Sequence, residues 1–344
     1  MKHPARPAGP GSFPGLICTL PLTAVLAACG GGGEGGGSPP PAPPAPPPGQ
    51  EITQPITEMP TSSHTGDKLA AFVRLNEARL AAGVGAVKQN AQLDAAAQAH
   101  ATYQVRNYVV GHGEDPNKPW FTGTNHAARA IAQGYSGRVM GEVITHAPPG
   151  TEAIESFLHS VYHLYGLLEP RANQIGLGID QITLPGPLNS TSITLGATAP
   201  GLLPVTPVWH WPVDRQTDVA PRFLPSGESP NPAPDLAVTG TPIMFCGSEG
   251  NYAPLHVLRV AVRKEHESNE LPLRLLRHST VEIGEGVNAE VVIDSNLGTI
   301  HQGCIFLLPI VELESGKTYE VRLEASQAGK NVEKTWTFST RHVH

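Results

Sequence analysis

The 344-residue chain is predicted to fold as an α+β region followed by an all-β sandwich. Three observations predict this. Segments with helical periodicity come first, two short strand-like runs close the same region, and several short β-like runs separated by turn signals fill the C-terminal part. Helices before short strands are typical of an α+β sandwich, and the length suits two domains of ordinary size.

Three segments of the first region have apolar residues at helical spacing. They are residues 67–82, 91–108 and 150–166. In the first helix, Asp67 is the expected N-cap and Gly83 the expected stop. Asn76 falls on the apolar face of this helix. Because a buried asparagine needs hydrogen-bond partners, we expect Asn76 to tie the helix to a loop.

The strand-like runs form two groups. The first is a pair at 175–184 and 191–198, separated by Gly-Pro-Leu-Asn at 186–189, which predicts a hairpin. The second group lies near the C-terminus, at 255–263, 289–295, 304–310, 318–326 and 334–341. Short strands with turn signals at such spacing predict a β-sandwich of immunoglobulin type.

Proline and glycine mark the expected domain boundaries, because much of both is concentrated in residues 30–49 and 199–234. Such segments do not build a core, and glycine-rich and proline-rich stretches serve as tethers. Trp209 and Trp211 in the second stretch are expected to anchor an irregular connector on the first domain. We expect a signal peptide at 1–28, a Gly/Pro-rich tether at 29–64, an α+β domain at 65–200, a Pro-rich connector at 201–234 and a β-sandwich at 235–344.

The N-terminus has the features of an export signal. Residues 1–12 are basic, and residues 13–28 are apolar but too short to span a bilayer as a helix. The run Leu-Ala-Ala before Cys29, followed by a glycine, resembles the lipobox of bacterial lipoproteins. This predicts an exported protein that a lipid on Cys29 attaches to a membrane, facing the periplasm or the cell exterior. The alternative is an ordinary secretory signal that is cleaved after an alanine.

The charge of the chain argues against nucleic acid as a partner. The sequence has 23 lysines and arginines against 30 acidic residues, a net charge of −7. Removal of the expected signal peptide takes away Lys2 and Arg6 and no acid, so the mature chain is more acidic still. No basic stripe appears that could follow a phosphate backbone.

Two cysteines remain after the signal peptide and the lipid site are set aside. They are Cys246 and Cys304, both in the C-terminal region. A pair of cysteines in an exported protein predicts one disulfide. The alternative is two free buried thiols.

Six short motifs of the first region follow one another in a recognisable order. They are Asn76-Glu77-Ala78-Arg79, Ala96-Ala97-Gln98-Ala99-His100-Ala101, His112 in a glycine-rich loop, Gly134-Tyr135 before Gly141-Glu142, Ser160-Val161-Tyr162-His163, and Ile175-Gly176-Leu177-Gly178. In this order they resemble the CAP superfamily of cysteine-rich secretory proteins, antigen 5 and pathogenesis-related proteins, whose bacterial members are often called SCP-like extracellular proteins. The resemblance implies a CAP-type α-β-α sandwich with a central cleft.

The resemblance also implies a site. In CAP proteins two histidines and two acids line the cleft, and some members bind a divalent metal there. His112, Glu142 and His163 match one histidine, one acid and the other histidine. The chain departs from the family pattern in two ways. Val143 replaces the asparagine after the glutamate, and no acid convincingly matches the second acid, although Glu114 and Asp115 lie close by.

The chemistry of these three residues leaves two interpretations open. Two imidazoles and one carboxylate can form a three-ligand zinc site with an open position for water, and such a metal would permit hydrolysis. Without a metal, His112, Glu142 and His163 would form a hydrogen-bonded polar cluster on a cleft wall.

Other histidines offer weaker arrangements. His159 and His163 are four residues apart on one expected helix and could share a metal, but no glutamate of the zinc-protease motif lies between them. Ser160 near His163 has no evident third partner that would make it a nucleophile. His100 and His126 are interpreted as core or surface histidines and not as ligands.

The favoured function is a surface-anchored binding module for a lipid, sterol or cell-envelope ligand. The alternatives are a metal-assisted hydrolase that uses His112, Glu142 and His163 with a divalent metal such as zinc, and a structural envelope protein.

The C-terminal part contains Gly316-Lys317-Thr318-Tyr319 and Trp336-Thr337-Phe338-Ser339-Thr340. With these motifs it resembles the Ig-like modules that follow CAP domains in some exported bacterial proteins. This resemblance implies a spacer or adhesion role. Fold family alone does not fix function.

Overall fold

The computed structural model describes residues 54–183, 186, 188–198, 204–296 and 299–342, which lie in one compact unit. The expected signal peptide and Cys29 lie outside the described residues. Within the described part of the chain, no helix is both long enough and apolar enough to cross a membrane.

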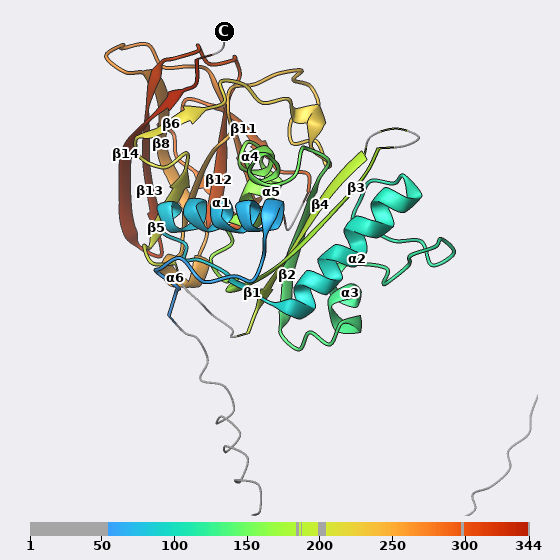
Figure 1. Ribbon diagram of the computed structural model, residues 1–344. Helices are drawn as coiled ribbons and strands as arrows, with labels where there is room; N and C mark the ends of the chain where they lie inside the picture. Colours follow the sequence, from blue (N-terminus) through green and yellow to red (C-terminus); the bar gives the residue numbers. More distant parts are fainter. Residues whose placement is uncertain (1–53, 184–185, 187, 199–203, 297–298, 343–344) are drawn as a thin grey trace, which may run out of the picture. The chain divides into compact units, whose positions relative to one another are not determined.

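The first part of the fold contains a four-stranded sheet (Figure 1). Its strands are β1 (Lys88–Gln89), β2 (Arg138–Thr145), β3 (Gln174–Ile182) and β4 (Leu188–Ala197), in the order β1-β3-β4-β2. Strands β3 and β4 form the expected antiparallel pair, and β2 pairs with β4 as an edge strand. The sequence patterns had not indicated β1 or β2.

Helices cover both faces of this sheet (Figure 1). The helices are α1 (Gly66–Ala82), α2 (Ala91–Asn107), α3 (His126–Ala132), α4 (Thr151–Leu158) and α5 (Tyr162–Leu167). Leu93 of α2 and Ala130 of α3 share a small core with Tyr135. Side chains of α1, α4 and α5 pack with Val143, Ile175 and Ile193 on the opposite face. This arrangement confirms the expected α-β-α sandwich of the first part.

Two details of the helices differ from expectation. Helix α1 begins at Gly66 after Thr65, so Asp67 lies in its first turn and is not the N-cap. The expected helix over 150–166 is interrupted, because α4 ends at Leu158 and α5 begins at Tyr162. Asn76 behaves as expected: its side chain accepts a hydrogen bond from the Val87 N–H (2.7 Å) and donates one to the Val87 carbonyl (3.2 Å).

The second part is β-rich and has two five-stranded sheets. The first, here called the inner sheet, has the order β11 (Glu290–Ile293), β9 (Leu273–Arg277), β12 (Cys304–Pro309), β7 (Ile243–Gly247), β5 (Val208–Trp211). The second, the outer sheet, has the order β10 (Glu282–Ile283), β8 (Leu255–Lys264), β13 (Thr318–Gln327), β14 (Lys330–Thr340), β6 (Gln216–Val219). Short helices occur at α6 (Glu249–Tyr252) and η1 (Pro225–Gly227).

The inner sheet is covered on both faces. Ile305 and Leu307 of β12 join the core between the two sheets, whereas Phe306 and Leu308 join the core that contains α1, α4 and α5. Successive side chains of a strand point to opposite faces, so β12 contributes to two cores at once. The layers therefore run from α2 and α3 through the first sheet, the helices α1, α4 and α5 and the inner sheet to the outer sheet.

The predicted connector contributes to this architecture. Its residues 208–211 form β5, which pairs with β7, and its residues 216–219 form β6, which pairs with β14. Trp209 and Trp211 are buried in the core shared with the helices of the first part. The exact domain boundaries given above stay predictions.

The predicted disulfide is confirmed between Cys246 and Cys304. The two residues lie directly opposite each other on the antiparallel neighbours β7 and β12. The bond therefore joins two adjacent strands of the inner sheet.

Candidate functional site

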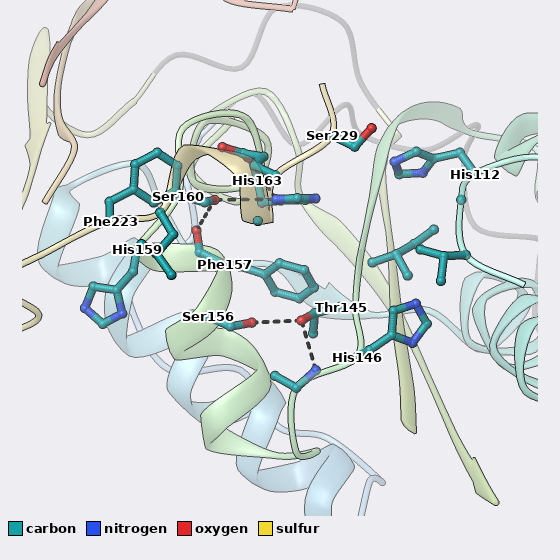
Figure 2. Close-up of a pocket in the computed structure, with 17 residues that line it drawn as sticks. His112, Thr145, His146, Ser156, Phe157, His159, Ser160, His163, Phe223 and Ser229 are labelled. Atoms are coloured by element: carbon teal, nitrogen blue, oxygen red, sulfur yellow. Dashed lines mark hydrogen bonds and ion pairs between the residues drawn. The ribbon is translucent and has the colours of Figure 1, made fainter. Parts of the chain in front are cut away.

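A groove runs along the free edge of β2. It consists of two cavities of ≈ 560 Å³ and ≈ 460 Å³, and the walls of both contain His112, His163 and Ser229. We call the two cavities together the β2 groove. Figure 2 shows the larger cavity, which β2 residues line together with Phe157 of α4 and Phe223 of the connector.

His112 and Glu142 are in direct contact. His112 lies in the loop between α2 and α3. Glu142 lies on β2, and its side chain is on the face of the sheet that α2 and α3 cover. The Nδ1 atom of His112 is 3.1 Å from Oε1 of Glu142. The imidazole is 48% exposed, whereas the carboxylate is only 1% exposed. The His112 ring therefore faces the groove, and the buried Glu142 carboxylate holds its Nδ1 atom by a hydrogen bond.

Arg129 of α3 holds the Glu142 carboxylate from the buried side. Its Nη2 atom donates to Oε1 at 2.8 Å and to Oε2 at 2.7 Å. Burial by itself raises the pKa of Glu142, but the hydrogen bond from His112 and the charges of His100 and Arg129 outweigh it, so the pKa is lowered. Glu142 is thus a carboxylate with its negative charge already compensated.

His100 belongs to the same buried network, which the sequence analysis did not foresee. Its Nδ1 atom lies 2.8 Å from Oε1 of Glu114, and its Nε2 atom lies 3.7 Å from Oε1 of Glu142. Burial raises the pKa of Glu114, yet the hydrogen bonds from His100 and the Thr122 N–H, together with Arg129, lower it overall. Glu114, the acid that the family pattern could not place, therefore supports the site from the protein interior.

His163 has a different acidic partner, Glu228 of the connector. The Nδ1 atom of His163 lies 2.9 Å from Oε1 of Glu228. The same carboxylate accepts the backbone N–H groups of Val161 (2.8 Å), Tyr162 (2.8 Å) and His163 (3.0 Å). Glu228 thus caps the first turn of α5, and this cap explains why a new helix begins there.

The structure brings His112, Glu142 and His163 to the walls of one cavity, the smaller of the two. Only His112 and Glu142 contact each other; the acid beside His163 is Glu228. Sequence reasoning missed Glu228 because it lies in a segment interpreted as an irregular connector, 65 residues from His163. It missed Arg129 because α3 was not expected.

These residues do not fit a metal. Among the described residues, no group of three or more His, Cys, Asp or Glu side chains is arranged to hold one. The lone pairs of Glu142 that a cation would need face the Arg129 guanidinium, whose positive charge repels a second cation. The arrangement of these side chains gives no support to the zinc site, which stays a prediction.

The structure also gives the surroundings of the other histidines considered above. His159 is the C-cap of α4, and the break before α5 removes the shared helical face expected for His159 and His163. The Ser160 hydroxyl donates a hydrogen bond to the Phe157 carbonyl (2.7 Å) and lies 3.5 Å from His163 Nδ1, which also faces the Glu228 carboxylate at 2.9 Å. Burial lowers the pKa of His126, which lies at the start of α3.

Comparison with known proteins identifies the first part. Residues 72–183 match the CAP family, described as the Cysteine-rich secretory protein family, so the chain contains a CAP domain. Among curated proteins, no significant match is found.

Two solved structures resemble part of the chain. One is an outer surface protein from Borrelia burgdorferi, with 15% identity and a TM-score of 0.33 over 38% of this chain and 92% of that one. The other is an extracellular protein containing a SCP domain from Bacillus anthracis, with 18% identity and a TM-score of 0.32. In the latter case the match covers 40% of this chain and 45% of the other, less than half of its length.

Proposed function

We propose that this chain is an exported, lipid-anchored CAP-domain protein that binds a lipid, sterol or other cell-envelope ligand in the β2 groove. One observation carries the proposal: His112 and His163, the two histidines that the CAP resemblance singles out, both line the walls of two adjacent cavities of ≈ 560 and ≈ 460 Å³. Concave sites of this size, lined by apolar groups with a few convergent polar ones, are suited to small ligands.

The lining of the groove supports a ligand with both apolar and polar parts. Phe157 and Phe223 provide apolar surface in the larger cavity, while Thr145 and Ser156 provide hydroxyl groups. Binding is favoured over metal-assisted hydrolysis because Arg129 occupies the carboxylate oxygens of Glu142 that a catalytic metal would require.

The anchor and the β-rich part complete the proposal. The lipobox-like sequence before Cys29 supports attachment to a membrane, and a Cys29→Ser variant is expected to leave the membrane fraction. We infer an immunoglobulin-like spacer for the β-rich part from its two stacked sheets. Its disulfide differs from that of antibody domains because it lies within one sheet.

A variant that fills the groove tests the proposal. Ser229 is exposed and lines both cavities, so Ser229→Trp is expected to obstruct ligand entry. Ser226→Trp is the matched control, because Ser226 is exposed three residues earlier and is not part of either lining. Binding of phospholipid vesicles, cholesterol micelles and cell-wall glycan fragments to residues 50–344 would be measured by thermal shift and calorimetry.

We expect at least one of these components to bind the wild type and the Ser226→Trp control equally, and to bind Ser229→Trp at least tenfold more weakly. Equal binding by all three proteins would place the ligand elsewhere. If none of the three components binds, the groove is rejected as an envelope-ligand site.

A further inference from the structure

Both groove histidines have their Nδ1 atom beside a buried carboxylate. His112 Nδ1 lies 3.1 Å from Glu142, and His163 Nδ1 lies 2.9 Å from Glu228. The two carboxylates are 1% and 2% exposed, while the two imidazoles are 48% and 19% exposed. The CAP sheet supplies one acid and the connector supplies the other.

Each carboxylate is fixed independently of the imidazole beside it. Arg129 donates to both oxygens of Glu142, and three backbone N–H groups at the start of α5 donate to Glu228. The Glu142 carboxylate can only accept hydrogen bonds, so its hydrogen bond with His112 places the proton on the imidazole Nδ1. At His163 the 2.9 Å approach of Nδ1 to a Glu228 oxygen favours the same tautomer. In a neutral imidazole the other nitrogen, Nε2, then carries a lone pair.

The Nε2 atoms are available to a ligand. Within the part of the chain that the structure describes, the side-chain hydrogen bonds and ion pairs of His112 and His163 all involve Nδ1. Both rings line both cavities of the groove. Figure 2 shows His112 and His163 among the residues that line the larger cavity, with Ser160 on the Nδ1 side of His163. The groove therefore presents two hydrogen-bond acceptors that are set by buried groups.

We propose that Glu142 and Glu228 fix His112 and His163 as a pair of hydrogen-bond acceptors, and that the β2 groove selects a ligand which donates hydroxyl groups, namely a saccharide. This inference rests on the proposed binding function and names the ligand class of the same site. Glu228, which lies outside the CAP match, is a positioning residue in this arrangement.

The other groups of the groove favour a saccharide over a simple anion. A sugar has hydroxyl donors as well as apolar C–H faces, and Phe157 and Phe223 offer the apolar surface for such faces. An anion such as inorganic phosphate brings mostly acceptors and a negative charge, which would meet the Nε2 lone pairs and the nearby Glu228 carboxylate. A sterol also carries a hydroxyl donor, but a single one, so it would satisfy only one of the two imidazoles.

Nuclear magnetic resonance tests the tautomers without any ligand. Long-range ¹H–¹⁵N correlation spectra of ¹⁵N-histidine-labelled residues 50–344 at pH 8 are expected to show His112 and His163 protonated at Nδ1, assigned with His112→Phe and His163→Phe. In Glu228→Gln, His163 is expected to lose this single tautomer while His112 keeps it. Glu282→Gln, beside the partly exposed His256, is the matched control and should change neither groove histidine. An Nε2–H tautomer at His163 in the wild type would overturn the inference.

Calorimetry with defined probes tests the ligand class. Chitotriose and maltotriose represent saccharides, cholesterol in micelles represents a sterol, and inorganic phosphate represents an anion. We expect at least one saccharide to bind, with at least a tenfold loss of affinity in His163→Phe and a smaller loss in Glu228→Gln.

The remaining outcomes separate this inference from the proposed function. Cholesterol binding that depends on His163 while both saccharides fail would support hydroxyl recognition with a sterol as its source, and would overturn the saccharide assignment. Phosphate binding in preference to both hydroxyl ligands would overturn the inference and leave the groove as a binding site. If an envelope component binds but His163→Phe leaves its affinity unchanged, the acceptor pair is not what selects the ligand.

Discussion

At the residue scale, the buried side chain of His210 makes the free energy of unfolding depend on pH in the acidic range. Its ring is 8% exposed and stacks on Trp336 with centroids 4.1 Å apart, and its Nδ1–H donates to the Pro212 carbonyl at 2.8 Å. Desolvation lowers the pKa of His210 to about 4. The folded protein therefore holds this imidazole neutral where an unfolded chain would already protonate it.

The sign of the effect follows from linkage. Between the ordinary histidine pKa of about 6.5 and the folded value of about 4, the unfolded chain binds more protons, so stability falls as the pH is lowered. We expect His210 to account for a loss of up to about 3 kcal/mol in the free energy of unfolding by pH 4. Urea denaturation of wild type and His210→Phe at several pH values measures this.

His266→Phe is the control, because the His266 side chain is 89% exposed. The His210→Phe variant should show a shallower pH dependence than both wild type and this control. Parallel curves for the three proteins would show that His210 titrates normally in the folded state.

The candidate site was only partly predictable from single residues. His112, Glu142 and His163 were identified from short motifs, and all three line one cavity in the structure. Their partners could not be identified in this way. Arg129 lies on a short helix without a clear periodic signal, and Glu228 lies within a proline-rich stretch whose pattern does not predict where its side chain points.

At the element scale, the contact between α2 and β3 depends on two glycines. A Cβ atom on Gly176 would lie 2.0 Å from the Leu93 carbonyl carbon, and one on Gly178 would lie 2.1 Å from the Ala97 carbonyl carbon. The helix backbone therefore rests directly on the strand. The small residues Ala96 and Ala97 of α2, both buried, allow the same close approach from the other side.

A single methyl group at this contact should be costly. We expect Gly178→Ala to lower the free energy of unfolding by about 3 kcal/mol, because rigid backbone atoms must move to admit it. Gly186→Ala is the control, since a Cβ there meets no atom within 4 Å. Chemical denaturation followed by circular dichroism measures both, and equal stability of the two variants would contradict the close packing of α2 on β3.

Strand patterns in the sequence also carried information about layers. Residues 318–327 alternate between buried and partly exposed positions, as a strand with one solvent-facing side should. Residues 304–309 are buried throughout. An uninterrupted apolar run indicates a strand that is covered on both faces, but it does not indicate what covers it.

At the scale of the whole molecule, the CAP domain and the β-rich part share one core. Residues of α1, α4 and α5 cluster with Met244, Phe306 and Leu308 of the inner sheet. Polar contacts cross the same boundary: Tyr162 Oη donates to Asp294 Oδ1 at 2.7 Å, and Glu228 caps α5. Neither part can be removed without exposing apolar surface of the other.

We therefore expect residues 50–344 to unfold in a single cooperative transition, observed with coincident near-ultraviolet and far-ultraviolet circular dichroism. A fragment that ends at residue 198 should lack cooperative unfolding and bind a hydrophobic dye, because α1, α4 and α5 lose the inner sheet. Two separate transitions in the longer protein, or a cooperatively folded fragment, would show that the parts are independent.

The sequence by itself determined the local features: the helical segments, the main strands, the order of CAP motifs and the cysteine pair that forms the disulfide. These features depend on periodicity, turn chemistry and residue spacing, which can be read directly along the sequence. The tertiary structure decided that α4 and α5 separate, that a connector glutamate pairs with His163, and that an arginine takes Glu142. Those outcomes depend on hydrogen bonds between buried donors and acceptors on segments that are distant in the sequence. A local sequence pattern does not show which distant groups come into contact.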